Sequence, residues 1–295
     1  MLHQRPRKVP TNCSEIFLKR IARADAAATL APMLTTAIRA AREAGDLLRR
    51  NFGKPLKRNE VTAHDIKLEM DVRAQATIER AILRAHPRHT ILGEEGVRGK
   101  FDGDYRWIVD PLDGTVNYAY AIPQFCVSIA CQKKSASRSP HDRLTPGWQT
   151  VAGVIYDPIR DEMSAASRDG AATLNGKRIH VSQRRALEDA IVSVGFFKTD
   201  ALIDQSMPHF KRLVHRARKV RIMGAAALDL AYVANGRYDV YLEYGVKLWD
   251  IAAGLLILER AGGVCELKPA YAPHAYNVFT SGRVNRAAVM GGRRL

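Results

Sequence analysis

The chain contains few cysteines and no long apolar run. Its four cysteines, Cys13, Cys126, Cys131 and Cys265, form no C-x-x-C pair and no cluster with histidine at zinc-binding spacing. Reduced thiols and a cytoplasmic location are therefore expected. No apolar stretch approaches the roughly 20 residues that a transmembrane helix needs, and the amino terminus lacks the apolar core and cleavage site of a secretory signal. These absences predict a globular protein without a membrane partner.

Basic residues clearly outnumber acidic ones. The 295 residues include 46 Lys and Arg against 30 Asp and Glu, a net charge of +16, while 46% of the chain is hydrophobic. Such a basic balance favours anionic partners: phosphorylated metabolites, nucleic acid or acidic lipid. Because the chain has no recognisable nucleic-acid motif and no basic stretch interleaved with aromatic residues, nucleic acid is the weaker expectation. A small phosphorylated metabolite is the stronger one.

The pattern of apolar residues predicts a basic, flexible extension at 1–30 and a single domain at 31–295 in two halves. The first half, 31–187, is expected to contain two helices and then a large sheet; the second, 188–295, alternates strands and helices. This order is typical of a layered α+β or α/β sandwich of alternating helix and sheet layers. The expected helices are 32–53, 69–85, 224–234 and 249–261, and the expected strands are 90–92, 107–109, 126–131, 151–156, 162–166, 191–194 and 238–243.

The most informative stretch is the apolar run Trp107–Val109, which ends in two aspartates three residues apart. The run predicts a buried strand, and the sequences Asp110-Pro111 and Asp113-Gly114 predict tight turns after it. Buried carboxylates are costly unless they are paired or bound to a cation. A second acidic pair, Glu94-Glu95, follows the preceding expected strand. Carboxylates converging at turns predict a site for a divalent cation such as Mg²⁺, which prefers oxygen ligands.

Two further features fit such a site. The amides of Gly114 and Thr115 would open a helix or an anion-binding nest that suits a phosphate. Asp250 stands at the start of an expected helix, where an aspartate usually serves as an N-cap. The helix that it opens is apolar nearly all round and should be buried. Because the chain already brings four other carboxylates that need a cation, metal binding is the preferred interpretation of Asp250.

Taken together, G-E-E at 93–95, D-P-L-D-G-T-x-N-Y at 110–118 and W-D-x-A-A-G at 249–254 resemble the inositol monophosphatase family. That family consists of Mg²⁺-dependent, lithium-sensitive phosphomonoesterases, and it commonly forms homodimers. The resemblance extends from about Pro32 to the end of the chain. It implies that 31–295 is a catalytic phosphatase domain, and it favours inositol 1-phosphate as the substrate.

The resemblance also implies roles for individual residues. Two Mg²⁺ ions would be held by shared carboxylates, and a third ion would be bound more weakly through water. Thr115, paired with Asp71 on the preceding helix, would orient the attacking water together with Glu94. The expected metal-binding residues are Glu94, Glu95, Asp110, the carbonyl of Leu112, Asp113 and Asp250. The expected substrate-binding residues are Asp113, Gly114, Thr115, Ala226, Glu243 and Asp250.

The chain departs from the family pattern at three positions. Glu60 stands where the family usually has a mobile-loop lysine, and Lys67 stands where it usually has a polar or apolar residue. Ala225 stands where the family usually has a serine or threonine. All the metal-binding carboxylates are present, so the departures are expected to affect loop closure, the third metal and substrate preference.

Several alternatives remain open at this point. The same fold could carry a 3′(2′),5′-bisphosphate nucleotidase, a fructose-1,6-bisphosphatase or a histidinol-phosphatase. A basic nucleic-acid-binding protein built on a phosphatase scaffold is the alternative from a different class. The sequence does not identify the physiological ester, the oligomeric state or the role of the extension.

Overall fold

A computed structural model describes residues 13–55, 58–61, 66–99, 103–135, 145–196, 199–270 and 272–291. The side chains of 13–29, 58–61 and 66–67 lie outside this description, and so do the expectations for Glu60, Lys67 and residues 1–12. No helix of the described parts is long and apolar enough to span a membrane.

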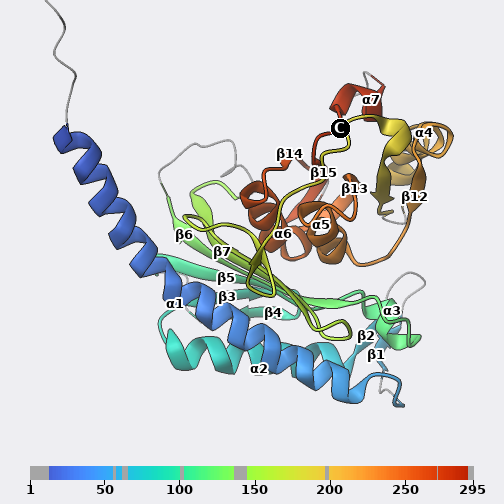
Figure 1. Cartoon of the computed structure of the whole chain (residues 1–295). Coiled ribbons are helices and arrows are strands. Elements are labelled where there is room, and N and C mark those ends of the chain that lie inside the picture. Colours follow the sequence, from blue (N-terminus) through green and yellow to red (C-terminus); the bar gives the residue numbers. More distant parts are fainter. Residues whose placement is uncertain are drawn as a thin grey trace, which may run out of the picture.

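The structure consists of five alternating layers of helices and sheets (Figure 1). Helices α1 (Cys13–Asn51) and α2 (Glu69–Ala85) pack on one face of an eight-stranded sheet. Helices α5 (Ala226–Ala234) and α6 (Leu248–Arg260) lie between its other face and a five-stranded sheet. The outer layer contains α4 (Asp200–Arg216) and the short α7 (Arg286–Met290). The predicted layered sandwich is confirmed.

Both sheets are mixed. In the larger sheet, with the order β10-β9-β8-β7-β6-β5-β3-β4, only β3 and β5 pair in parallel; in the smaller, with the order β12-β11-β13-β15-β14, β11 is parallel to both of its neighbours. The strands of the larger sheet are β3 (Thr90–Gly93), β4 (Gly96–Arg98), β5 (Tyr105–Asp113), β6 (Cys126–Lys134), β7 (Trp148–Asp157), β8 (Glu162–Ser167), β9 (Thr173–Leu174) and β10 (Lys177–Arg178). Those of the smaller are β11 (Ile191–Val194), β12 (Lys219–Arg221), β13 (Val240–Lys247), β14 (Val264–Pro269) and β15 (Ala275–Ser281). The remaining elements are the hairpin β1 (Arg58–Val61) and β2 (Ile66–Leu68), the short helix α3 (Thr115–Ala119) and a 3₁₀ turn at Leu187–Asp189.

A bulge in β5 orients the two motif aspartates. Asp110 pairs with Ser128 of β6 and Asp113 with Cys126, so three steps on β5 match two on its partner. Residues three apart in a regular strand point to opposite faces. The extra residue lies at Pro111-Leu112, where proline could not donate a ladder hydrogen bond in any case. It brings both carboxylates to the same side of the sheet.

The predicted elements match well in the first half and less well in the second. Helix α2 has the expected bounds, and Asn175-Gly176, a dipeptide typical of hairpins, makes the tight turn between β9 and β10. The prediction that the first helix begins at Pro32 is wrong, because α1 begins at Cys13 and Pro32 lies inside it. The alanine-rich run that precedes Pro32 has a high helix propensity, which offsets the proline. Helix α4 and strands β12, β14 and β15 are additional to the prediction; α4 also contains an internal proline, Pro208.

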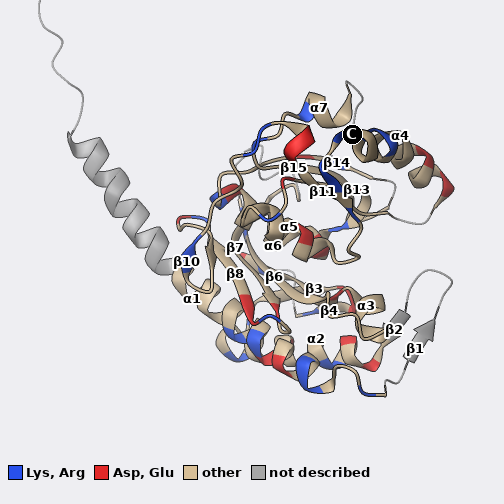
Figure 2. Ribbon diagram, turned by 45° about the vertical axis from the view of Figure 1, so that its right-hand side comes forward, with Lys and Arg blue, Asp and Glu red and all other residues tan. Residues whose placement is uncertain are grey.

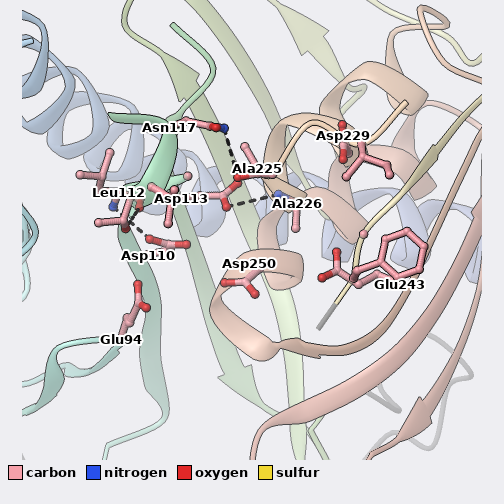
Figure 3. Close-up of a pocket in the computed structure, with 17 residues that line it drawn as sticks. Glu94, Asp110, Leu112, Asp113, Asn117, Ala225, Ala226, Asp229, Glu243 and Asp250 are labelled. Atoms are coloured by element: carbon pink, nitrogen blue, oxygen red, sulfur yellow. Dashed lines mark hydrogen bonds between the residues drawn. The ribbon is translucent and has the colours of Figure 1, made fainter. Parts of the chain in front are cut away.

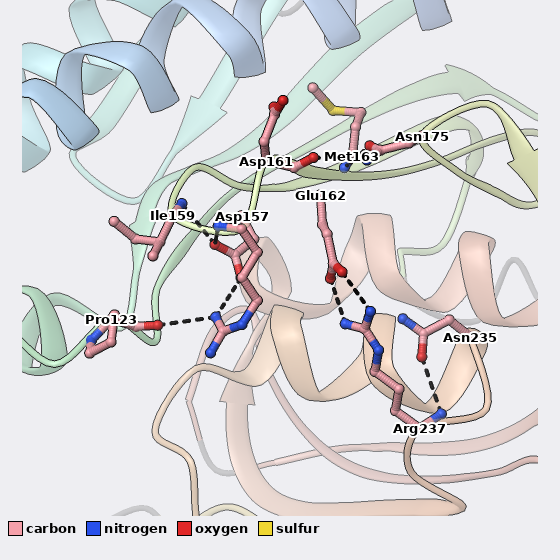
Figure 4. A network of polar contacts seen from close by, with 10 residues as sticks. Pro123, Asp157, Ile159, Asp161, Glu162, Met163, Asn175, Asn235 and Arg237 are labelled. Carbon is pink, nitrogen blue, oxygen red and sulfur yellow. Dashed lines mark hydrogen bonds and ion pairs between the residues drawn. The ribbon is translucent and has the colours of Figure 1, made fainter.

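Arginine side chains join the two halves and support the loop after α3 (Figure 4). Arg237, between α5 and β13, makes a two-pronged ion pair with Glu162 of β8. Arg160 donates to Asp157 at 2.7 Å and to the carbonyl of Pro123 at 3.1 Å. Asp157 is buried, so its carboxylate fixes the position of Arg160. Arg160 in turn holds the loop that follows the D-P-L-D-G-T motif through the Pro123 carbonyl.

His89 provides a test of the packing between α2 and the sheet. Its Nδ1 accepts a hydrogen bond from Trp107 Nε1 at 3.1 Å, and its ring stacks between those of His86 and Tyr105. Burial, with smaller contributions from the neighbouring basic groups, lowers the pKa of His89 from 6.5 to about 4.

In the unfolded chain His89 therefore binds a proton near pH 6.5, whereas in the folded chain it binds one only near pH 4. The stability that His89 contributes is complete above pH 6.5 and is lost as the pH falls toward 4. We expect His89→Phe to lower the unfolding free energy at pH 7 but to reduce its further decrease between pH 7 and 5, as measured by urea unfolding. The exposed His215→Phe is the control for replacing a histidine by phenylalanine and should keep the wild-type unfolding free energy at pH 7. An unchanged slope in His89→Phe would contradict the prediction.

Candidate active site

A cavity of about 430 Å³ lies between the two halves (Figure 3). It brings together most of the residues that the sequence singled out, from both ends of the chain. Asp71 and Glu95, which were also expected at the site, do not line it. The expected residues that line it are Glu94, Asp110, Leu112, Asp113, Gly114, Thr115, Ala226, Glu243 and Asp250.

Asp110 is the most strongly perturbed carboxyl group of the motif. It is 2% exposed, and its Oδ1 accepts a hydrogen bond from the amide of Leu112 at 3.0 Å. Burial raises its pKa well above the usual value, and the charges of Glu94, Asp113 and Asp250 raise it further. A bound cation would offset the electrostatic repulsion among these four carboxylates.

Asp113 connects the motif to α5. Its Oδ1 accepts from the amide of Ala226 at 3.2 Å and its Oδ2 from that of Ala227 at 2.7 Å. Burial raises the pKa of Asp113 to about 6, against the opposing effect of these amide hydrogen bonds. Asp113 thus caps α5 from a distant part of the chain. Ala225, which departs from the family pattern at the N-cap position, supplies no side-chain cap of its own.

Asp250 caps its own helix and also faces the cavity. Its Oδ2 accepts from the amide of Lys247 at 2.9 Å, as expected for an aspartate in the first turn. Burial raises its pKa well above the usual value, followed by the charges of Asp113 and Glu94. The capping role and the cavity-lining position therefore coexist in one side chain.

Thr115 and Asp71 are paired as the resemblance implied. The hydroxyl oxygen of Thr115 lies 3.2 Å from Asp71 Oδ1 and 3.0 Å from the Leu112 carbonyl oxygen. Asp71 is 2% exposed, and its Oδ2 accepts from the amide of Leu68 at 2.6 Å, which caps α2. Burial raises its pKa to about 7, and the nearby charge of Glu95 adds to this effect. Asp71 therefore does not line the cavity itself but contacts Thr115, which does.

The cavity suits a hard cation by the chemistry of its donors. Six carboxyl groups line it, and none of its described lining residues is Lys, Arg or His. Mg²⁺ prefers such oxygen donors and retains several waters. Within the described residues, no three Asp, Glu, His or Cys side chains are already close enough to hold a metal ion. The side chains that fit one are Glu94, Asp110, Asp113 and Asp250, with the carbonyl of Leu112.

Several lining residues were not predicted. Asn117 Nδ2 lies 2.8 Å from the carbonyl oxygen of Gln124 and 2.9 Å from that of Met223, and so links loops of the two halves. Asp229, on α5, is 2% exposed, and burial raises its pKa well above the usual value. The only sequence signal for Asp229 is a single acid within an otherwise apolar helix. The remaining unpredicted lining residues are Val116, Gly195, Phe196, Ile222, Gly224 and Ala225.

The fold and the cavity together define a protein of the phosphatase superfamily. More specifically, the chain belongs to the inositol monophosphatase family, whose model matches residues 29–276. The Nus factor SuhB of Pseudomonas aeruginosa is 43% identical over 241 residues, which cover 79% of this chain and 84% of that protein.

Solved structures agree with this assignment. The extragenic suppressor protein suhB from Bartonella henselae superposes with a TM-score of 0.75 at 33% identity, covering 85% of this chain and 93% of that one. The inositol monophosphatase from Anabaena (Nostoc) sp. superposes with a TM-score of 0.71 at 35% identity, covering 86% of this chain and 92% of that one.

Gly114 tests how tightly the motif loop is packed. Its φ is +91°, and an added Cβ would lie 2.8 Å from the carbonyl oxygen of Gln124. Gly176 also has a positive φ of +75°, but an added Cβ there meets nothing within 4 Å. Gly176→Ala should cost roughly 1–2 kcal/mol of unfolding free energy, from the left-handed backbone alone. We expect Gly114→Ala to cost clearly more in urea unfolding; equal costs would show that the loop yields freely.

Proposed function

We propose that the protein hydrolyses a small phosphate monoester with Mg²⁺, with inositol 1-phosphate as the preferred substrate. The observation that carries this proposal is the meeting of Glu94, Asp110, Asp113 and Asp250 around one cavity that also exposes the Gly114-Thr115 turn. The proposal includes lithium sensitivity and a homodimer, which the family resemblance implies, and a cytoplasmic location, which the cysteine pattern favours. It assigns catalysis to a domain at 31–295 and leaves the basic extension at 1–30 outside it.

The cavity has two walls, one with Glu94 and Asp110 and the other with Asp229 and Glu243 (Figure 3). The residues of each wall would have a different part in the reaction. Bound Mg²⁺ would activate a water and stabilise the charge of the transferred phosphoryl group and of the leaving oxygen. Glu94 and the Thr115 hydroxyl would orient the water. Asp71 would hold that hydroxyl and accept the proton that the water loses. The amides of Gly114 and Thr115 would bind phosphate oxygens. No covalent intermediate is required, because no activated serine or cysteine is among the described lining residues.

The alcohol part of the ester would lie on the opposite wall. Glu243 and Asp250 would meet its hydroxyl groups, and the backbone of Ala226 would contact it. Glu95, which lies outside the cavity, would hold the waters of a third Mg²⁺. The support for Glu95 is its position near Asp71, whose pKa it raises.

A second candidate role is nucleic-acid binding, which the net charge of +16 favours. The name Nus factor, carried by the Pseudomonas relative, does not denote a hydrolase. Steeply salt-dependent RNA binding without any phosphatase activity would support this role over hydrolysis. Six carboxyl groups around one cavity, three of them buried, have no purpose in nucleic-acid binding, and they favour the hydrolase.

Asp110→Asn is the central test of the proposal. We expect turnover of inositol 1-phosphate with Mg²⁺ to fall by several orders of magnitude while circular dichroism remains unchanged. Because burial and neighbouring acids raise the pKa of Asp110, its charge destabilises the metal-free fold, and the variant should unfold at an equal or higher temperature without Mg²⁺. The exposed Asp169→Asn is the control. Near-normal Mg²⁺-dependent activity in Asp110→Asn would overturn the assignment.

Asp71 can be tested by comparing two variants. Asn keeps an acceptor for the Leu68 amide, whereas Ala removes it, so Asp71→Ala should lose about 0.5–2 kcal/mol more stability through the lost cap. If Asp71 acts on the water through Thr115, both variants should lose kcat by about a hundredfold or more with little change in KM. A small, equal effect on kcat in both would show that Asp71 serves only α2.

A further inference from the structure

The second carboxyl group at the alcohol end of the cavity, Asp229, has no role in the chemistry described above. It lies on α5, one turn after Ala226, and lines the cavity. Its Oδ2 accepts a hydrogen bond from Ser193 Oγ of β11 at 2.8 Å. Its Oδ1 is buried and has no hydrogen-bond partner among the described residues. A buried polar atom left unpaired is costly, so this oxygen is suited to receive a ligand group.

Glu243 lies on the same wall. The hydroxyl of Tyr241 donates to its Oε2, and this oxygen lies so close to Gly195 that an added Cβ there would clash with it. Gly195 therefore leaves the space that lets Glu243 reach the cavity. Figure 3 shows Asp229 and Glu243 together on the side opposite Glu94 and Asp110. The cavity thus has acidic residues at two ends, with Glu94 and Asp110 at one and Asp229 and Glu243 at the other.

The charge of the cavity limits what its alcohol end can bind. The described lining residues include six carboxyl groups and no basic side chain, although the chain as a whole has a net charge of +16. A hydroxyl group can pair with a carboxyl group in either protonation state, because a hydroxyl both donates and accepts. A second phosphate would need cationic partners, and the described part of this wall offers none.

We propose that Asp229 is a specificity-determining residue that hydrogen-bonds a hydroxyl group of the substrate's alcohol part, so that the enzyme selects monophosphates of uncharged polyols and disfavours bisphosphates. This inference rests on the proposed function and narrows it. It ranks the bisphosphate nucleotidase and fructose-1,6-bisphosphatase alternatives below a polyol monophosphatase.

The test compares three substrates with the full chain. Inositol 1-phosphate supplies ring hydroxyls, p-nitrophenyl phosphate has none, and fructose 1,6-bisphosphate adds a second phosphate. We expect wild type to prefer inositol 1-phosphate over the bisphosphate by at least about tenfold in kcat/KM. Asp229→Ala should lower kcat/KM for inositol 1-phosphate by about tenfold, mainly through KM, and change p-nitrophenyl phosphate hydrolysis less than about threefold. Ser193→Ala, which removes the hydrogen bond that orients Asp229, should shift the same ratio less.

The exposed Asp169→Asn is the matched control and should leave all ratios unchanged. The inference would be overturned if Asp229→Ala lost the same kcat/KM on inositol 1-phosphate and p-nitrophenyl phosphate, or lost none on either. A wild-type preference for the bisphosphate would also overturn it. If Asp229→Ala does not fold, the Ser193→Ala ratio decides by the same criteria.

Failure of the proposed function has a different signature, because wild type would then hydrolyse none of the three esters. In that case calorimetry with free myo-inositol decides the inference. Binding to wild type that weakens at least about tenfold in Asp229→Ala supports it, and equal or absent binding overturns it.

Discussion

Asp113, at the end of β5, accepts hydrogen bonds from the first free amides of α5, and the geometry of the cavity depends on this contact. A carboxylate at a helix amino terminus satisfies unpaired N–H groups and complements the helix dipole. Strand β5 also carries Asp110, and α5 also carries Asp229, so the contact sets how far apart the two acidic ends of the cavity lie. The cavity therefore forms only when both halves of the chain are docked.

The acids that line the cavity are held against their own electrostatic preference. Burial raises the pKa of Asp110, Asp113, Asp229 and Asp250, and neighbouring acids add to this effect at Asp110 and Asp250. Basic residues instead lie on outer helices such as α2 and α4, where acidic residues alternate with them (Figure 2). The net charge of +16 favours anionic partners at long range, whereas the six carboxyl groups that line the cavity favour a cation at close range. Packing by the surrounding layers maintains this arrangement.

Much of the site was predictable because its motifs are local. The strand that ends in two aspartates and helix α2 follow from apolar spacing and turn residues over short stretches. The contact between Thr115 and Asp71 was predictable only through the family resemblance. Asp229 escaped prediction because a lone acid in an apolar helix carries no sign of where it points. Ala225 stands at the N-cap position of α5 without a capping side chain, and only the tertiary structure shows that Asp113 supplies the cap.

The sequence by itself determined the class of chemistry: hard oxygen donors at turns, beside amides suited to an anion. Tertiary structure alone decided which of these donors share a cavity. A side chain's direction depends on the bulge at Pro111-Leu112 and on how α5 docks, and both arise from contacts between residues far apart in the chain. For that reason Glu95 falls outside the cavity and Asp229 inside it. Local patterns specify the chemical groups, whereas non-local packing specifies their neighbours.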